Sequence, residues 1–294
     1  DYVNGKWIES TKDTIVYGGE SAIELPFLFP DLHMDDFVTY DKDYIKTDKD
    51  MMFSEKRNLK ISYQKKQDRY LLFPYFCDIS QIEGNVISDS MISRTNSRKD
   101  YDMVYYQVKN PKAVFQAQQR LDFSKIGSTM EEIMEKDYIK TMDDYGTYVR
   151  KEYLKIPDSI KKCLKTLDLK TDLKKSENQN IEEVQSYLKR NYQYSYRPGL
   201  TPQGKDPIVY FLKDRKKGFC TQYASAAVFM LRNAGIPARY VEGYKIRSDQ
   251  WRLGKAQVTD YEAHAWAEVY VEHIGWLPVE VTGMNTGKTA YEQV

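Results

Sequence analysis

Residues 218–237 read Gly-Phe-Cys-Thr-Gln-Tyr-Ala-Ser-Ala-Ala-Val-Phe-Met-Leu-Arg-Asn-Ala-Gly-Ile-Pro, the stretch with the clearest structural pattern in the sequence. From Tyr223 to Leu231 the apolar side chains recur with helical spacing, which predicts a buried helix. Gly235 and Pro237 follow, a combination that ends helices, so we expect the helix to stop just before Gly235. Cys220 opens this helix.

Cys220 is the candidate nucleophile. The partial positive charge at a helix N-terminus stabilises an anion, and three basic residues, Arg215, Lys216 and Lys217, come just before the helix. Both features favour the thiolate over the thiol, and the thiolate is the nucleophilic form of cysteine. The next requirement is a base that lies near it in space.

Downstream of the helix the sequence predicts an antiparallel sheet. Residues 238–246 read as one strand and 262–271 as a second, in which residues alternate strictly between two faces. His264 and Glu268 share one of these faces. After a brief turn, residues 276–281 read as a third strand, which can pair back on the second and bring Glu280 near His264.

Glu280 is the preferred acid partner of His264. Glu268 lies four strand residues from His264, about 13 Å away, and Glu262 about half that distance, so both exceed hydrogen-bond reach. Whether Glu280 lies on the same face of the sheet as His264 depends on the number of residues in the turn. A two-residue turn would place Glu280 on the face opposite His264, whereas a three-residue turn or a bulge places it on the same face. The predicted site is Cys220, His264 and Glu280.

Neither the remaining cysteines nor the histidines indicate a metal. Cys77 and Cys163 lie in apolar patterns and are expected to be buried. Three widely spaced cysteines without a Cys-x-x-Cys pair form neither a disulfide framework nor a zinc site. His33, His264 and His273 are too few and wrongly spaced for a metal centre, so we expect no metal and no cofactor.

The chain before the cysteine helix divides into a β-rich part and a helical part, which predicts a β-rich N-terminal domain over 1–110 and a second domain over 111–294. Within the second, a long helical pattern ends at Pro157 and a short helix follows. Four runs in the first part have the composition of strands: 14–17, 59–63, 70–73 and 102–108.

Two more helix starts are predicted from capping residues. Asn180 and Glu183 fit a capping box, so we expect a helix from Asn180, preceded by a solvated loop over 168–178. Asp206 followed by Pro207 predicts an N-cap and first helical residue, with a short helix running through residue 212.

Composition excludes several classes of protein. The 294 residues carry 44 Lys and Arg against 43 Asp and Glu, a net charge of +1, so there is no excess positive field for nucleic acid. With 41% hydrophobic and 14% aromatic residues the chain is not disordered, and no stretch approaches the ~18 apolar residues of a membrane helix. Residues 199–205 fit the start of a phosphate-binding loop, but Asp206 replaces its hydroxyl residue and Pro202 removes a backbone donor.

Four motifs give the chain a resemblance to the transglutaminase-like core of bacterial proteins, over about residues 153–283. Val-Asn-Gly-Lys-Trp at 3–7 is also similar to a tract found upstream in membrane-anchored members. The resemblance implies a papain-related α+β fold with a cysteine, a histidine and an acid as the triad, although the acid of the family is usually aspartate. The motifs are Gly-Phe-Cys-x-x-Tyr-Ala-Ser-Ala from 218, Leu-Arg-x-Ala-Gly-Ile-Pro-Ala-Arg-Tyr-Val-x-Gly-Tyr from 231, His-Ala-Trp-Ala-Glu-Val from 264 and Gly-Trp-x-Pro-Val-Glu-Val-Thr from 275.

The expected fold is thus α+β, with the cysteine at a helix N-terminus packed on an antiparallel sheet. The expected activity is thiol-dependent amide hydrolysis, as in a cysteine protease acting on peptides or proteins. Protein-glutamine crosslinking and a non-catalytic cell-surface scaffold stay open as alternatives. The backbone N–H of Cys220 is one expected oxyanion donor. The side-chain donor of the family is not located in the sequence, and Tyr194 and Gln222 are two candidates for it.

The resemblance also gives an expectation about location. Similar proteins carry this domain outside the cytoplasmic membrane, tethered by flanking helices. We therefore expect this chain to be the extracytoplasmic part of a membrane-anchored bacterial protein. Its expected partner is a peptide or protein substrate, with no nucleic acid and no membrane contact by this segment itself.

Overall fold

Two compact units make up the chain in a computed structural model, and each is described by itself. The core unit comprises Asp1–Glu9, Val149–Tyr270 and Trp276–Val294, and the inserted unit comprises Ser10–Tyr148 and Val271–Gly275. The structure describes residues 2–7, 27–32, 34–37, 52–63, 70–80, 82, 84–88, 91–94, 100–125 and 130–282.

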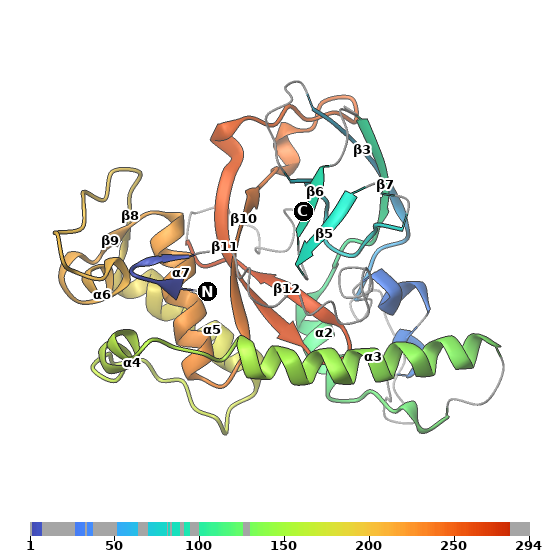
Figure 1. The fold of residues 1–294 in the computed structure, drawn as a ribbon, viewed down its shortest axis with the longest axis horizontal. Coiled ribbons are helices and arrows are strands. Elements are labelled where there is room, and N and C mark those ends of the chain that lie inside the picture. Colours follow the sequence, from blue (N-terminus) through green and yellow to red (C-terminus); the bar gives the residue numbers. More distant parts are fainter. Residues whose placement is uncertain are drawn as a thin grey trace. The chain divides into compact units, whose positions relative to one another are not determined.

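The cysteine helix, α7 (Cys220–Asn233), is the centre of the core unit (Figure 1). Every residue from Tyr223 to Leu231 is buried, so the helix is covered on all sides. It ends as the sequence predicts: Gly235 takes a left-handed φ of 80°, which suits glycine just beyond a helix end. The helix packs against α4 (Asp158–Leu164), α5 (Glu177–Asn191) and the first strand of the sheet.

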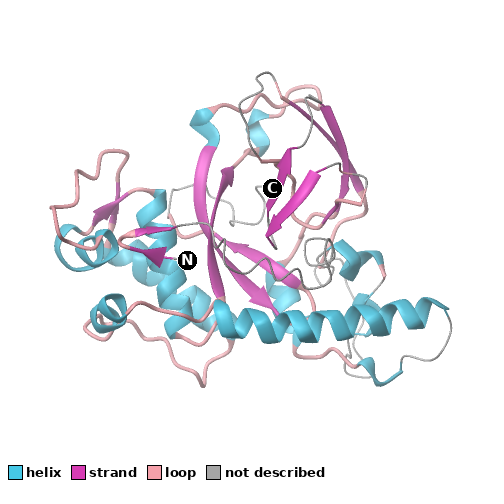
Figure 2. Cartoon of the chain, viewed as in Figure 1, coloured by secondary structure: helices cyan, strands magenta, loops and turns pink. Residues whose placement is uncertain are grey.

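That sheet is antiparallel and has the strand order β10-β11-β12, as predicted (Figure 2). Strand β10 (Ala238–Tyr244) pairs with β11 (Ala263–Val271), and this register sets Gly243 opposite His264. Strand β12 (Gly275–Val279) follows after residues 272–274. These three intervening residues are the turn length that favours Glu280 on the face of His264.

The helix α5 begins earlier than predicted. Ser176, not Asn180, is its N-cap, and the capping box pairs Ser176 with Gln179. Asn180 is instead buried in the first turn, where its side chain accepts a hydrogen bond from the backbone N–H of Asp172 and donates one to the carbonyl of the same residue. The predicted start was wrong because the asparagine serves the preceding loop, a contact that local spacing does not reveal.

The segment before Cys220 is short and irregular. Asp206 caps α6 (Pro207–Tyr210) as predicted, accepting from the N–H groups of Ile208 and Val209. The chain continues as a π-helical stretch, Phe211–Arg215. Strand β9 (Lys217–Gly218) then pairs in parallel with β8 (Gln193–Tyr194), which leads the chain directly into α7.

An N-terminal hairpin also belongs to the core unit, although more than 140 residues separate it from the rest. It consists of β1 (Tyr2–Val3) and β2 (Lys6–Trp7). The Trp7 indole stacks on the rings of Phe229 and Tyr240, with centroids 5.3 Å apart in both cases. Its N–H donates to the Ser225 hydroxyl at 2.8 Å. Packing of an aromatic ring whose N–H has a hydrogen-bond acceptor stabilises this side of α7.

The inserted unit contains a small sheet of order β3-β7-β4 and helices after it. Cys77 begins β4 and is buried in the apolar cluster of this sheet, as predicted. The predicted strand at 70–73 was wrong, because only an isolated bridge forms at Tyr70, and the predicted strand at 14–17 lies outside the described residues. The elements are η1 (Met34–Phe37), β3 (Arg57–Ser62), β4 (Cys77–Asp78), β5 (Gly84–Ser88), β6 (Met91–Arg94), β7 (Asp100–Tyr105), α2 (Pro111–Gln118) and η3 (Phe123–Lys125).

The long helix α3 (Met130–Glu152) confirms the helical spacing in the sequence. Tyr138, Met142, Tyr145 and Val149 recur on its buried face. The chain then turns before Pro157, where α4 begins, and Cys163 lies buried in α4 as predicted.

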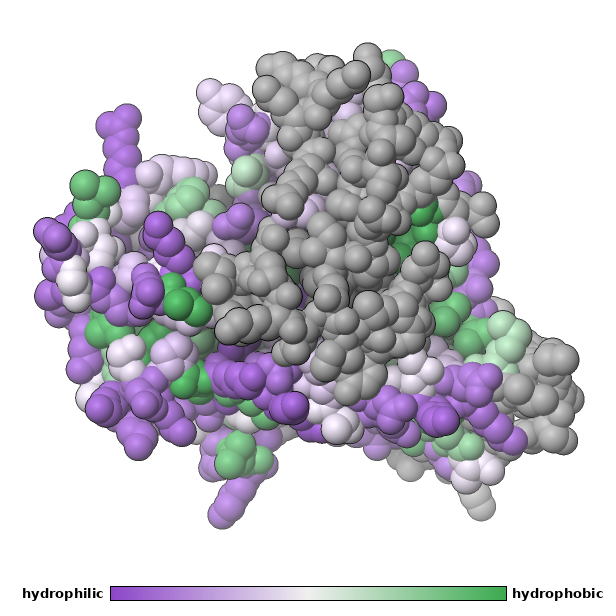
Figure 3. Space-filling model, viewed as in Figure 1, coloured by the Kyte–Doolittle hydropathy of each residue, from purple (hydrophilic) through white to green (hydrophobic). Residues whose placement is uncertain are grey.

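The described surface is largely polar in the view of Figure 3, with apolar side chains scattered among charged ones. Within the described residues, no helix has the length and apolar character that crossing a membrane requires.

Candidate active site

Cys220 is the first residue of α7 and is buried, with a relative exposure of 3%. Phe219 precedes it as the N-cap, and the backbone N–H of Phe219 donates to the side-chain oxygen of Gln222 at 3.0 Å. The thiol lies in a small apolar cluster with Ala224 and Ala265. Cys220 therefore stands at the N-terminus of a buried helix, the position that the sequence predicts.

His264 stands on β11, near the thiol of Cys220 and the carboxylate of Glu280. Its Nε2 lies 2.8 Å from Oε2 of Glu280, and its ring is within hydrogen-bonding reach of the Cys220 thiol. Because Nε2 is engaged with the carboxylate, Nδ1 is the ring nitrogen left for the sulfur. The Trp266 ring stacks on the imidazole with centroids 6.1 Å apart, which limits its rotation.

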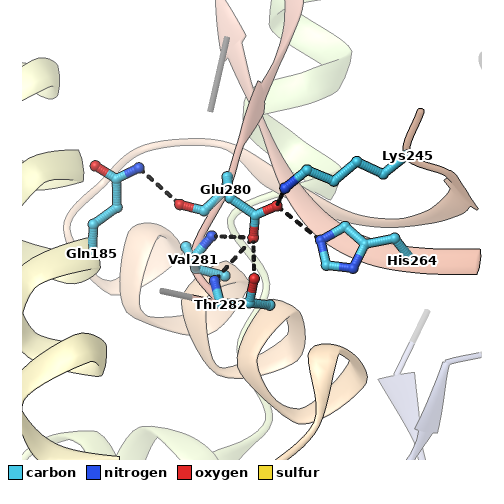
Figure 4. Close-up of polar contacts among 6 residues, drawn as sticks. All are labelled: Gln185, Lys245, His264, Glu280, Val281 and Thr282. Carbon is cyan, nitrogen blue, oxygen red and sulfur yellow. Dashed lines mark hydrogen bonds and ion pairs between the residues drawn. The ribbon is translucent and has the colours of Figure 1, made fainter. Parts of the chain in front are cut away.

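Glu280 follows β12 and is held by a dense set of donors (Figure 4). Its Oε1 accepts from the backbone N–H of Val281 and of Thr282, each at 2.9 Å, and from the Thr282 hydroxyl at 2.7 Å. Its Oε2 accepts from His264 and from Nζ of Lys245, the latter at 2.5 Å. The backbone carbonyl of Glu280 accepts from the Gln185 side chain. The carboxylate turns back over its own following residues, which accommodates the additional methylene of glutamate.

The rival carboxylates lie elsewhere. Glu268 forms a buried ion pair with Arg239 at 2.6 Å, its cross-strand partner in the β10–β11 register. Glu262 caps the short turn before β11 by accepting from the N–H and hydroxyl of Thr259. The structure therefore brings Cys220, His264 and Glu280 together and leaves the other two acids out of the group.

The charges in this group favour an ion pair. Burial of the His264 ring lowers its pKa, but hydrogen bonds to Cys220 and Glu280 and the charge of Glu280 outweigh burial and raise the pKa to about 9. For Glu280, burial raises the pKa, but the hydrogen bond and charge of His264, together with Lys245, hold it well below its usual range. At neutral pH the histidine is therefore an imidazolium bound to a carboxylate.

Of the two candidate side-chain oxyanion donors, Tyr194 is the one that lies near the sulfur of Cys220. Its hydroxyl is within hydrogen-bonding reach of Cys220, and burial together with the Cys220 charge raises its pKa, so it stays a donor. Gln222 is occupied with the N-cap of α7. Tyr196 and Phe219 pack near the Tyr194 ring and support its orientation.

Lys245 is the residue of this site that sequence reasoning missed. It stands just after β10, and its backbone N–H donates to the carbonyl of Glu262. The strand pairing could have revealed it, because Gly243 lies opposite His264 and Lys245 is two residues further on the same face.

Cys163 lies in α4 of the core unit, and Cys77 and His273 lie in the inserted unit. Burial raises the pKa of Cys77 to about 12 and raises that of Cys163, so both are poor nucleophiles. His33 lies outside the described residues. In the inserted unit, Nε2 of His273 lies 2.7 Å from Asp143, and with Glu272 these form the one group of described residues that has a spacing suited to a metal ion. Asp143 is exposed and already paired with the histidine, and His264 has no part in this group.

Comparison with known proteins identifies the family of this part of the chain. Residues 166–281 match the model of the Transglutaminase-like superfamily, so the chain contains a transglutaminase-like core over these residues. This range includes α7, β10 to β12 and the group around Cys220. The resemblance inferred from the four sequence motifs, and the α+β class that it implied, are confirmed.

Two relatives are similar in sequence to part of the chain. An uncharacterized protein of Bacillus subtilis, YebA, is 32% identical over 160 residues, which are 52% of this chain and 21% of that protein. A protein-glutamine gamma-glutamyltransferase of Pseudomonas aeruginosa is 38% identical over 99 residues, which are 34% of this chain and 14% of that protein. The matched parts are therefore a small share of either relative.

Among solved structures, the periplasmic domain of TgpA from Pseudomonas aeruginosa, bound to ethylmercury, is similar to 77% of this chain. The match covers 71% of that chain, with 21% sequence identity and a TM-score of 0.47.

Proposed function

We propose that the chain is a thiol-dependent amide hydrolase, a cysteine protease that acts on peptides or proteins through Cys220, His264 and Glu280. The observation that carries the proposal is that the Cys220 thiol, at the N-terminus of a buried helix, lies within reach of the His264 imidazole, which is hydrogen-bonded to Glu280. A nucleophile, a base and a group that orients the base are the parts that acyl transfer requires.

The reaction begins from the state in which the thiol proton of Cys220 has passed to His264, so that the sulfur is a thiolate and the ring an imidazolium. The thiolate sulfur attacks the carbonyl carbon of an amide and forms a tetrahedral oxyanion. Collapse of this intermediate breaks the C–N bond, and the imidazolium of His264 gives its proton to the departing amine. The product is a thioester on Cys220. Water then attacks the thioester, passes a proton to His264, and releases the acid and the thiol.

Glu280 fixes which nitrogen of His264 faces the sulfur and stabilises the imidazolium. The oxyanion would be bound by the backbone N–H of Cys220 and by the Tyr194 hydroxyl, which already lies near the sulfur. These roles use side chains that all lie in the core unit.

Phenylalanine in place of Tyr194 tests the second oxyanion donor. We expect Tyr194→Phe to lower kcat about 10²-fold with a small change in KM, because the lost hydrogen bond forms fully only with the oxyanion. Steady-state kinetics on a single peptide substrate checks this. An unchanged kcat would remove Tyr194 from the mechanism, and Tyr196→Phe, a change to an exposed neighbouring hydroxyl, is the matched control.

Transamidation is the second candidate function. It is favoured by the sequence match to a protein-glutamine gamma-glutamyltransferase. The same thioester would form from a glutamine side chain with release of ammonia, and a primary amine would replace water in the second step. A non-catalytic scaffold is the third candidate, and its support is the glutamate that replaces the usual aspartate.

One experiment separates the three. The protein is incubated with casein, with and without a dansylated primary amine, and the products are resolved on a gel. Fragments support the protease, and fluorescent casein supports transamidation. Neither product, with no difference from a Cys220→Ala variant, supports the scaffold and contradicts both enzymatic proposals. Cys163→Ala, which changes a buried cysteine outside the site, controls for nonspecific effects of thiol removal.

Location is part of the same proposal. We infer that the chain works on the extracytoplasmic side of a bacterial membrane, tethered by segments outside this sequence. Proteolysis of intact cells that express the full-length protein tests this inference. Cleavage of the domain without lysis supports it, and protection until lysis contradicts it.

A further inference from the structure

We propose that Lys245 is a positioning residue that holds the Glu280 carboxylate in place and limits the basicity of His264. This inference rests on the proposed triad. Nζ of Lys245 and Nε2 of His264 bind the same carboxylate oxygen, Oε2, at 2.5 and 2.8 Å (Figure 4). The side chain of Lys245 is 23% exposed, so its charge is partly shielded from solvent.

The first role follows from the length of glutamate. Glutamate has one more rotatable bond than the aspartate usual in the family, and holding it in one orientation costs conformational entropy. Residues 281 and 282 fix Oε1 with three donors. Oε2 would otherwise depend on His264 alone. Lys245 adds a charge-assisted hydrogen bond to Oε2 and so fixes both oxygens of the carboxylate.

The register of β10 and β11 places Lys245 near Glu280 and His264. Gly243 lies opposite His264, and Lys245 follows two residues later on the same face. The hydrogen bond from its backbone N–H to the Glu262 carbonyl, at 2.9 Å, continues the pairing beyond the end of β10. This hydrogen bond fixes the backbone of Lys245, from which the side chain extends to Glu280.

The second role is electrostatic. An imidazolium that is held too firmly by a carboxylate is a weak acid and a poor proton donor to a departing amine. The titratable groups that face His264 are Cys220 from α7, Glu280 after β12 and Lys245 after β10. Tyr194 from β8 interacts with both Cys220 and Glu280. Among these groups Lys245 is the cation, and its positive charge lowers the pKa of His264. Cys220 and Glu280 both raise this pKa.

The test is an NMR titration of the imidazole signals in protein labelled at histidine. The sequence has three histidines, so His264 is assigned by comparison with a His264→Gln variant. In the wild type we expect its titration midpoint near pH 9. Lys245→Met should raise the midpoint by about one pH unit, because the positive charge of the lysine ammonium, which is bound to the shared oxygen, is lost. Lys245→Arg should restore the wild-type midpoint. Lys255→Met, a change to an exposed lysine of the same loop, should leave it unchanged.

Turnover provides the second readout. Lys245→Met should lower kcat roughly tenfold with KM unchanged, and Lys245→Arg should recover most of it. Lys245→Gln repeats the test with a polar side chain, and thermal unfolding establishes that each variant is folded.

The outcomes distinguish this inference from the proposed function. A wild-type midpoint near 6.5, the ordinary value for histidine, would contradict the ion pair and with it the proposed triad. A wild-type midpoint near pH 9 that stays unchanged or falls in folded Lys245→Met and Lys245→Gln would overturn the role of Lys245 alone.

Discussion

Replacing Cys220 with alanine is expected to lower amide turnover about 10⁴-fold or more, to the background of the assay. The reason is that Cys220 is the nucleophile next to His264, and without its sulfur no thioester can form on this residue. The measurement is the rate of amine or ammonia release from casein under the conditions that give wild-type turnover. Burst kinetics of the first product in the wild type, and its absence in the variant, would link the loss to the covalent step.

Cys163→Ala is the matched control, because it removes a buried thiol from α4 and leaves the site intact. It should keep wild-type turnover, with a modest loss of stability from the small cavity. Substantial turnover by folded Cys220→Ala would contradict the account, since the chemistry would then belong to another group.

Glu280→Gln is expected to have the second largest effect, a fall in kcat of about 10³-fold to 10⁴-fold. Glutamine has the same shape but no charge, so it neither stabilises the imidazolium nor fixes the tautomer of His264. It also leaves the ammonium of Lys245 without its charged partner. Steady-state kinetics at pH 7 measures the effect, and Glu280→Asp should retain more turnover than the glutamine variant because it keeps the charge.

Glu262→Gln provides the control for this prediction. Glu262 is the other acid close to His264 in sequence, but it accepts its hydrogen bonds from Thr259 and Gln250. Its substitution should leave kcat within a few fold of wild type. If Glu262→Gln abolished turnover and Glu280→Gln did not, the roles of the two carboxylates would be reversed.

The grouping of Cys220, His264 and Glu280 was predictable from the sequence because these candidate site residues lie on or next to regular elements. Apolar spacing and the Gly235 stop define the helix that carries Cys220, and strict alternation defines the strand that carries His264. The partner acid depended on the parity of one turn. The structure has three residues between the two strands, which is the length that the choice of Glu280 required.

Residues that act through tertiary contacts escaped this reasoning. Lys245 reaches Glu280 from a strand end, and only the cross-strand register brings it there. Asn180 reads as a helix cap, but it binds the preceding loop and leaves the cap to Ser176. Trp7 lies in the motif at residues 3–7, and its stacking on Phe229 and Tyr240 joins segments far apart in the chain. None of these contacts has a local sequence signal.

The most direct test of the account is the rate at which iodoacetamide alkylates each cysteine at pH 6, measured by peptide mass spectrometry. An ordinary buried thiol is protonated at this pH and reacts slowly, whereas a thiolate paired with an imidazolium reacts fast. The account predicts that Cys220 reacts at least about 10²-fold faster than Cys77 and Cys163, and that His264→Ala removes this advantage. Equal, slow labelling of all three cysteines in the wild type would contradict it.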